Sequence, residues 1–429
     1  MSRHILVVLV TLLLLVVVFD PSDSLIGAKR YVFISLLVWW ALIQIKGTRP
    51  LEVSRASLLI VLCFGLFLPN ISMISLLLQG GGYSWQELLN SSVSYYSLVL
   101  LVPFSRMMGL VLPIFLRVIG LQVVATIAIY ILVILIPDLT EAIIEFGYQN
   151  GFLWVYLKSY GEFQFMQVFF KTAPFMVFSV AYYSAYCFSS FKPLSWFAIF
   201  MLLASCFALT ISGTRSNIMF AMIIPIYFVF GFGGSRKKAP AKPFLLLLLF
   251  AIFGGLIANA DLVFSMFDPL EQSNSIKIGY LDDYANILSD PVVLLFGQGI
   301  GSVQYFPSFG EYMSATELTL LELIRVFGIV AALAYLGFWL APLVILKRRR
   351  FTGFHWFRVA YGCYLVICLS NNFIISSTGM VLLSIVYGLC LIPANINYSF
   401  HKKLASLEII PLRNLEKLQT IISSNARPN

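Results

Sequence analysis

Long apolar runs alternate with short polar segments from residue 5 to residue 397. Many runs are about 20 residues long, the length that an α-helix needs to cross a hydrocarbon core of roughly 30 Å. Lipid offers no partners for backbone polar groups, and the ten-residue alternation of a membrane barrel is absent, so we expect helices to span. The pattern predicts about twelve spans, approximately at residues 5–20, 31–46, 57–78, 93–113, 118–137, 172–190, 195–212, 216–233, 243–260, 317–346, 357–375 and 379–397.

The fourth span is the least regular of these. Arg106 interrupts the apolar run over residues 93–117. An interfacial or re-entrant helix fits that run as well as a full crossing. The run 5–19 is interpreted as the first span rather than a signal peptide, because no small-residue cleavage site follows it.

Composition supports a membrane protein, since 60% of the residues are hydrophobic and 11% are charged, far from the values of soluble domains. The pattern predicts an all-α polytopic membrane protein with a single membrane domain over residues 1–429. No CxxC pair occurs, and no disulfide framework or zinc site is indicated. The six cysteines all fall in predicted spans: Cys63, Cys187, Cys206, Cys363, Cys368 and Cys390.

The net charge of +9 is distributed in a way that predicts orientation. Most Lys and Arg fall on the cytoplasmic side if the N-terminus is cytoplasmic, which satisfies the positive-inside rule. Both termini are then cytoplasmic, and residues 398–429 form a basic tail. Nucleic acid is not an expected partner, because the cations lie in short loops between spans rather than on one folded patch.

Two long segments, residues 138–171 and 261–316, fall on the opposite side, the periplasmic side of a bacterial inner membrane. Both are rich in acidic and aromatic residues. Loops of this length are usually functional or disordered, and their apolar content favours folded caps at the membrane surface.

Arg215 is the first candidate functional residue, because it occupies a tight turn at the outer end of two spans, against the charge bias. Something is expected to compensate it. It either snorkels to lipid phosphates or grips an anionic lipid-linked substrate. A second feature is the glycine-rich stretch 297–301, which predicts a sharp turn or close backbone packing rather than a nucleotide site.

The beginning of the tenth span carries a third group of candidates. Glu317, Arg325 and Gly328 have a spacing that puts them on one face of a helix. An ionisable residue inside a span is a functional candidate. Alternatively, Glu322 and Arg325 neutralise each other at i and i+3.

These features together resemble the Wzy-type O-antigen or capsule polymerases and the related O-antigen ligases. Three elements match in order over roughly residues 195–340: the turn Ser212–Ser216, the stretch from Lys277 through Pro291 to Gly301, and the segment Glu317–Ile329. The resemblance implies a GT-C-like fold. It also implies transfer of a glycan from undecaprenyl pyrophosphate to an incoming lipid-linked repeat unit, without a cofactor.

The resemblance also implies roles for individual residues. Arg215, Lys277 and Arg325 would bind the pyrophosphate, and Glu317 would act as the base. Other candidates, as reserve bases or as sugar contacts, are Asp282, Asp283, Tyr280 and Tyr284. Expected partners are undecaprenyl-pyrophosphate-linked glycans, membrane lipids, a chain-length regulator and a flippase.

Departures from the family pattern narrow the choice. Ligases carry a histidine where this chain has Glu317, and the histidines here, His4, His355 and His401, fall on the cytoplasmic side, so polymerase is the favoured subclass. Lys277 stands where arginine is usual and lacks its bidentate geometry. A flippase or transporter is the alternative of a different class, and it predicts ionisable groups near mid-bilayer and short outer loops.

Overall fold

The computed structural model describes residues 2–25, 27–46, 54–79, 85–160, 163–188, 195–231, 271–348, 354–369 and 371–392. The predicted span at 243–260 and the basic tail at 398–429 lie outside these residues. The first half contains α1 (Ser2–Phe19), α2 (Lys29–Lys46), α3 (Arg55–Ile60), the π-helical segment η1 (Val61–Phe67), α4 (Leu68–Gln79), α5 (Trp85–Tyr96), the 3-10 segment η2 (Ser97–Leu100), α6 (Leu101–Leu135) and α7 (Pro137–Asn150).

The second half adds further helices and two short hairpins. Its elements are β1 (Leu153–Tyr160), β2 (Phe163–Phe170), η3 (Ala173–Phe175), α8 (Met176–Phe188), α9 (Trp196–Ile211), α10 (Arg215–Gly231), α13 (Gln272–Ile287), α14 (Pro291–Phe296), β3 (Gln304–Phe306), β4 (Glu311–Met313), α15 (Thr319–Arg348), α16 (His355–Leu369) and α17 (Ser377–Cys390). The fold is therefore mainly helical, and the two hairpins correct the prediction of an all-α chain.

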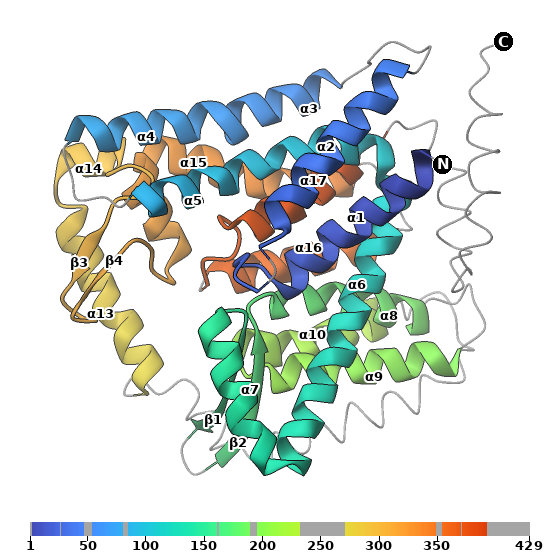
Figure 1. Ribbon diagram of the computed structural model, residues 1–429. Helices are drawn as coiled ribbons and strands as arrows, with labels where there is room; N and C mark the ends of the chain where they lie inside the picture. Colours follow the sequence, from blue (N-terminus) through green and yellow to red (C-terminus); the bar gives the residue numbers. More distant parts are fainter. Residues whose placement is uncertain are drawn as a thin grey trace.

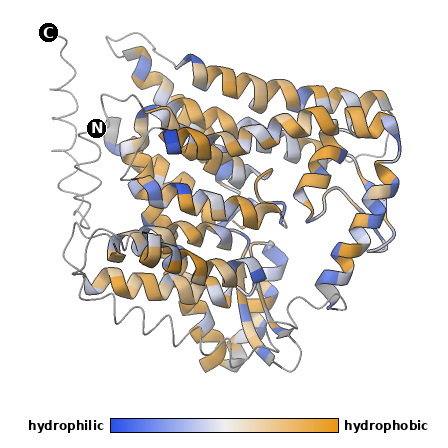
Figure 2. Cartoon of the chain, turned by 180° about the vertical axis from the view of Figure 1, so that it is seen from behind, coloured by the Kyte–Doolittle hydropathy of each residue, from blue (hydrophilic) through white to orange (hydrophobic). Residues whose placement is uncertain are grey.

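Among the described residues, three helical runs are long and apolar enough to cross a membrane: Arg55–Leu78, Ser91–Leu135 and Thr319–Arg348. Shorter apolar helices, including α8, α9, α10, α16 and α17, accompany them. Figure 1 shows many of these helices lying side by side with similar axis directions. Figure 2 shows that they are hydrophobic along most of their length, whereas α13 at the edge of the molecule carries many hydrophilic positions. These features are those of a helical membrane protein.

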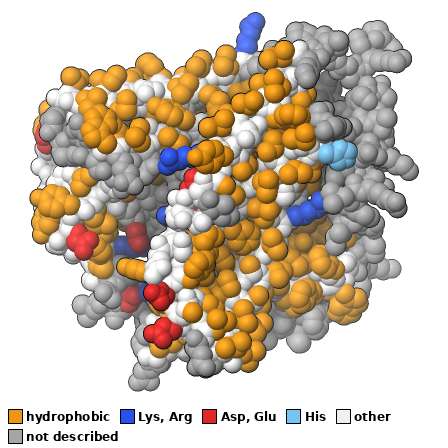
Figure 3. Space-filling model, in the orientation of Figure 1, with side chains coloured by type: hydrophobic (Ala, Val, Ile, Leu, Met, Phe, Trp, Pro, Cys, Tyr) orange, Lys and Arg blue, Asp and Glu red, His pale blue; other side chains and the backbone are white. Residues whose placement is uncertain are grey.

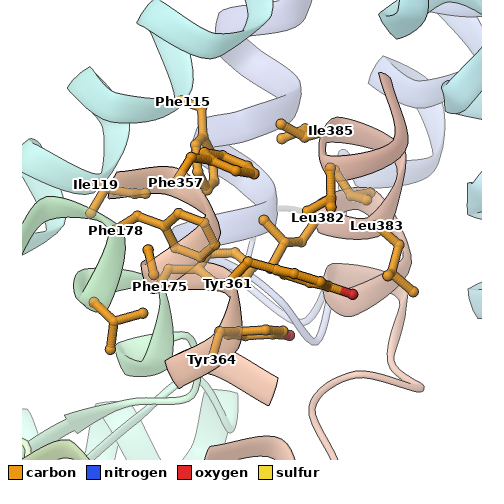
Figure 4. Close-up of a cluster of buried hydrophobic side chains, with 14 of the residues drawn as sticks. Phe115, Ile119, Phe175, Phe178, Phe357, Tyr361, Tyr364, Leu382, Leu383 and Ile385 are labelled. Carbon is orange, nitrogen blue, oxygen red and sulfur yellow. The ribbon is translucent and has the colours of Figure 1, made fainter. Parts of the chain in front are cut away.

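Aromatic side chains fill the centre of the bundle, where α6, α8 and α16 meet (Figure 4). The ring of Phe178 lies 5.4 Å from that of Phe115 and 5.1 Å from that of Phe357, measured between centroids. Helices in lipid associate through close van der Waals packing rather than through hydrophobic burial. Interlocking rings supply that contact over a large area.

The two arms around Arg106 are joined by a bend and not by a loop. Residues 97–135 are helical except at Met107, where φ is −108° and ψ is 16° and two helical arms meet at a kink. In Figure 1, α5 runs beside α4, whereas the later part of α6 turns away past α8 and α9. The predicted boundary between residues 113 and 118 is therefore wrong. Pro113 lies inside α6, where loss of one hydrogen bond is tolerated without ending the helix.

The segment 138–171 folds into α7 and the antiparallel hairpin β1–β2, paired from Leu153↔Phe170 to Tyr160↔Phe163. Val155 and Val168 are buried and pack with Val133 of α6. The expectation that this segment is folded is confirmed, although its strands were not predicted. Eight paired positions with an apolar face explain why strands form here.

The glycine-rich stretch 297–301 links α14 to the neighbouring helices by close backbone contact, as predicted. Gly297, Gly299 and Gly301 have φ of 74°, 94° and 84°, a region that side chains other than glycine rarely adopt. A Cβ on Gly299 would lie 2.4 Å from Cβ of Leu76 in α4.

Gly328 divides α15 into a short first part and a long apolar second part, with φ of 76° and ψ of 163°. The break frees two backbone carbonyls of α15. The amide nitrogen of Gln298 donates to the carbonyl oxygen of Arg325 at 2.6 Å, and that of Gly299 donates to the carbonyl oxygen of Val326 at 3.0 Å. Glu317 precedes the helix. The prediction that Glu317, Arg325 and Gly328 share one continuous helix face is therefore wrong.

Candidate functional site

Arg215 is the first residue of α10 and follows a tight turn that the β1–β2 hairpin supports. Nε2 of Gln167 donates to the carbonyl oxygen of Ser212 at 2.8 Å. The side chain of Gln167 also packs against Gly213, where a Cβ would lie 2.4 Å from its Cδ. The hairpin thus holds the turn that presents Arg215, as the sequence predicted for its position at a helix end.

The guanidinium of Arg215 contacts two side chains at the start of α13. It forms an ion pair with the carboxylate of Glu271 and donates to Oδ1 of Asn274. Lys158 of β1 forms an ion pair with the same carboxylate, with Nζ 3.4 Å from Oε1 of Glu271. These contacts provide the compensation expected for a cation on the outer side.

Glu271 is held in place by the helix that it begins. As the N-cap residue of α13, its carboxylate accepts from the amide nitrogen of Asn274 at 3.2 Å. Burial alone would raise the pKa of Glu271, but Arg215 and then Lys158 outweigh it, and the net pKa lies below its ordinary value of 4.5. Glu271 therefore carries its negative charge at neutral pH.

The same helix brings Lys277 to Glu317, with Nζ 3.0 Å from Oε2. The side chain of Glu317 is 56% exposed and that of Lys277 is 28% exposed, while those of Arg215 and Lys158 are 19% and 20% exposed. We use the name charged cluster for a set of six residues. Its members are Lys158, Arg215, Glu271, Asn274, Lys277 and Glu317.

Three buried oxygen atoms around the turn have no hydrogen-bond partner among the described residues. They are Oε1 of Gln167, Oγ1 of Thr214 and Oδ1 of Asn217. Nδ2 of Asn217 donates to Oγ of Ser212 at 2.8 Å, so its oxygen is the unpaired end. Buried polar atoms without a hydrogen-bond partner are costly, so these three atoms mark a strained part of the turn.

Arg325 is not part of the charged cluster. Its guanidinium is fully buried, and each of its nitrogens is hydrogen-bonded to a protein atom. Nε and Nη2 bind the carboxylate of Glu322 at 3.0 and 2.6 Å. Nη1 reaches Oε1 of Gln298 and Oγ of Ser302 at 2.9 and 2.7 Å, and Nη2 also reaches the carbonyl of Ser314 at 2.8 Å. The structure therefore agrees with the alternative that the sequence offered, in which Glu322 and Arg325 neutralise each other.

The candidates on α13 divide by burial. Asp282 is exposed. Asp283 is buried, and its Oδ2 accepts from the amide nitrogen of Ser308 at 3.1 Å. Tyr280 and Tyr284 are buried against Phe306, and the hydroxyl of Tyr284 donates to Oε2 of Glu322 at 2.6 Å. Three of the four thus hold the 271–316 segment together in this structure.

Sequence reasoning did not single out Lys158, Glu271 or Asn274. Tyr156 was also missed as a neighbour of the cluster. It is partly exposed on β1, and its pKa is raised, mainly by burial and further by the charges of Glu317 and Glu271. The only signal available was that an outer arginine needs a partner, which does not say which acid supplies it.

The described residues of the cluster combine cations and carboxylates. Within the described residues, no group of three or more His, Cys, Asp or Glu could hold a metal ion. Figure 3 shows acidic side chains gathering on the side of the molecule near α7 and α13, while hydrophobic side chains cover much of the other described surface in this view. The cations of such a group can bind an anion, and a partly exposed carboxylate beside them can accept a proton.

Comparisons with known proteins add no assignment. No protein-family model matches the chain, and no curated protein is similar to it in sequence.

Proposed function

We propose that the chain is a membrane glycosyltransferase that polymerises undecaprenyl-pyrophosphate-linked oligosaccharide repeat units into O-antigen, capsule or exopolysaccharide. The observation that carries the proposal is the charged cluster. It joins the candidates Arg215, Lys277 and Glu317 through α13, although they are far apart in the sequence. All three side chains are partly exposed.

The cations suit a pyrophosphate leaving group. Three cations, Lys158, Arg215 and Lys277, stand against two carboxylates, Glu271 and Glu317, so the cluster carries a net charge of +1. An anionic donor would compete with Glu271 for Arg215. As the glycosidic bond to phosphate breaks, negative charge develops on the pyrophosphate, and fixed donors stabilise that charge.

Glu317 is the proposed base. Its carboxylate is the most exposed of the ion-paired acids in the charged cluster. The acceptor hydroxyl loses its proton as it attacks the sugar carbon, and a carboxylate within reach accepts that proton. Arg325 is saturated by protein atoms, so the proposal assigns it to holding the loop 298–314 rather than to the substrate.

The proposal includes the topology that the charges predict. About twelve spans, a GT-C-like arrangement and a bacterial inner-membrane location with cytoplasmic termini would put the cluster on the periplasmic face. Polyprenyl chains stay in lipid there while the sugars stay in water. A chain-length regulator and a flippase are the proposed partners. A ligase remains the nearest alternative activity and a transporter the alternative of another class.

The test is a purified-enzyme assay with synthetic undecaprenyl pyrophosphate repeat units, read as a glycan ladder. Arg215→Ala and Glu317→Gln are each expected to lower the rate by about 10²-fold, the order of magnitude for loss of one transition-state contact. Arg30→Ala and Glu311→Gln are matched controls, because both residues are exposed and lie outside the cluster.

Two results would overturn the proposal. In the first, Arg215→Ala builds the same ladder as Arg30→Ala. In the second, the wild-type protein builds no ladder from the organism's own repeat unit but moves that unit across a liposome membrane, which supports the transporter alternative.

A further inference from the structure

An apolar groove runs along α16, where residues of α10 and α15 also line it. Its volume is about 380 Å³. Gly362 and Cys363 of α16 lie in its wall, between Phe220 of α10 and Leu343 of α15. Two cations, Lys347 and Arg358, also line it.

The two cations lie at the same end of the groove. Lys347 is in the last turn of α15, and Arg358 is in the first turn of α16. From Arg358 the groove extends along α16 to Val366, about 12 Å at 1.5 Å per residue. Arg215 begins α10, and Glu317 precedes α15, so the charged cluster lies at the opposite ends of these helices.

The two cations at this end of the groove have no carboxylate partner among the residues that the structure describes. Nη2 of Arg358 lies 3.0 Å from Nδ1 of His355, whose Nε2 is 2.9 Å from the hydroxyl of Tyr227. Within the described part of the chain, no carboxylate pairs with Arg358 or with the exposed Lys347. The imidazole of His355 therefore contacts Arg358 without neutralising its positive charge.

We propose that this groove binds an anionic phospholipid, with one acyl chain along α16 and the phosphate between Lys347 and Arg358. The apolar wall matches the acyl chain, and the two cations match the phosphate. Basic pockets between spanning helices on the cytoplasmic side commonly hold such head groups. Most cations of the chain also predict that this end is cytoplasmic.

Gly362 leaves room for the chain in the groove. A Cβ at this position would lie in ordinary contact, 3.8 Å from Cδ2 of Leu343. A larger side chain would occupy the groove itself. The site thus has a polar half and an apolar half that can be altered separately.

The experiment measures lipid retention by native mass spectrometry of the full chain in detergent, with phosphatidylglycerol or phosphatidylcholine added. Wild type is expected to retain phosphatidylglycerol in preference to phosphatidylcholine. Lys347→Gln and Arg358→Gln should each weaken phosphatidylglycerol binding about fivefold, the effect of one cation at a lipid phosphate. Arg348→Gln is the matched control, because this exposed neighbour does not line the groove.

Gly362→Phe tests the apolar half with both cations intact. It should abolish phosphatidylglycerol retention, while Gly337→Phe, at an open position of α15, should leave it unchanged. If Gly362→Phe does not fold, the charge variants decide alone. The proposal is overturned if both lipids are retained equally, if Arg348→Gln weakens binding as much as Lys347→Gln, or if undecaprenyl phosphate displaces phosphatidylglycerol at equal concentration.

Discussion

At the scale of single residues, the role of each charge depends on what surrounds it. Arg215 and Arg325 both lie in the first turns of a helix, and each is paired with a glutamate. Arg215 keeps 19% of its side chain exposed, whereas Arg325 is fully buried. The first can exchange its carboxylate for an incoming anion, and the second cannot do so without opening the fold.

Glu271→Gln should alter stability in a pH-dependent way. The pKa of Glu271 lies below 4.5 in the folded protein, so its carboxylate stabilises the fold above the unfolded value and ceases to do so as the pH falls through the folded pKa. We expect wild type to have the higher Tm at pH 7, with the difference constant down to about pH 4.5 and shrinking below it.

Thermal unfolding in detergent at several pH values measures this effect. Glu311→Gln, an exposed acid of β4, is the control. A Tm difference for Glu271→Gln that stays constant down to pH 3 would contradict the linkage.

Arg325→Met should destabilise the protein strongly, because Glu322 would keep a buried charge without a partner. Breaking a buried ion pair from one side costs about 3–5 kcal/mol. The double change Arg325→Met with Glu322→Leu should cost less, since no charge is left buried. Denaturant titration in detergent compares the two, with Arg348→Met as an exposed control; equal losses for the single and double variants would argue against the buried-charge explanation.

At the scale of elements, glycines decide where helices bend and how closely the loops approach them. The carbonyls freed at the break in α15 are used by the glycine-rich loop and by Oγ of Ser72, which donates to the carbonyl of Val326 at 2.9 Å. The break at Gly328 therefore lets α15 form hydrogen bonds with α4 and with the loop that follows α14. Its position in a long apolar run gave no sign of this role.

Gly328→Ala should cost at least about 2 kcal/mol of stability, because an L-residue is strained at this φ and its Cβ would lie 2.1 Å from the carbonyl oxygen of Leu295. Gly337→Ala in the same helix has open space around it and should change stability by less than about 1 kcal/mol. Denaturant titration of both variants measures the contrast. Equal effects would show that the bend does not depend on glycine.

At the scale of the whole molecule, orientation decides whether the charged cluster meets periplasmic substrates. A cysteine at Ser289, an exposed position after α13, should react with a membrane-impermeant maleimide in intact cells. A cysteine at Ser235, in the basic segment after α10, should react only after the membrane is opened. The native cysteines lie in helices and are wholly or partly buried, which keeps the background low.

The reverse labelling pattern would put the charged cluster on the cytoplasmic side. It would then contradict both the proposed orientation and a periplasmic polymerase. A parent protein with all native cysteines replaced by serine is the control for background labelling.

Much of the membrane helix pattern could be read from the sequence, because about 20 apolar residues in a row is a local property that lipid selects directly. The close packing of residues 297–301 could also be predicted from the sequence, since glycine adopts positive φ without strain and has no side chain to separate two backbones. The bend at Met107 was not, because helix continuity there depends on packing rather than on the local residues.

What the sequence determined by itself was a helical membrane protein, an arginine in a turn that needs a compensating partner, and a glycine-rich loop. Tertiary structure decided which charges meet. Glu271 reaches Arg215 across 56 residues and Lys158 across 113, and no periodicity records a contact of that range. Burial likewise separated Arg325 from Arg215, because the environment of a charge is set by what packs around it and not by its neighbours in the chain.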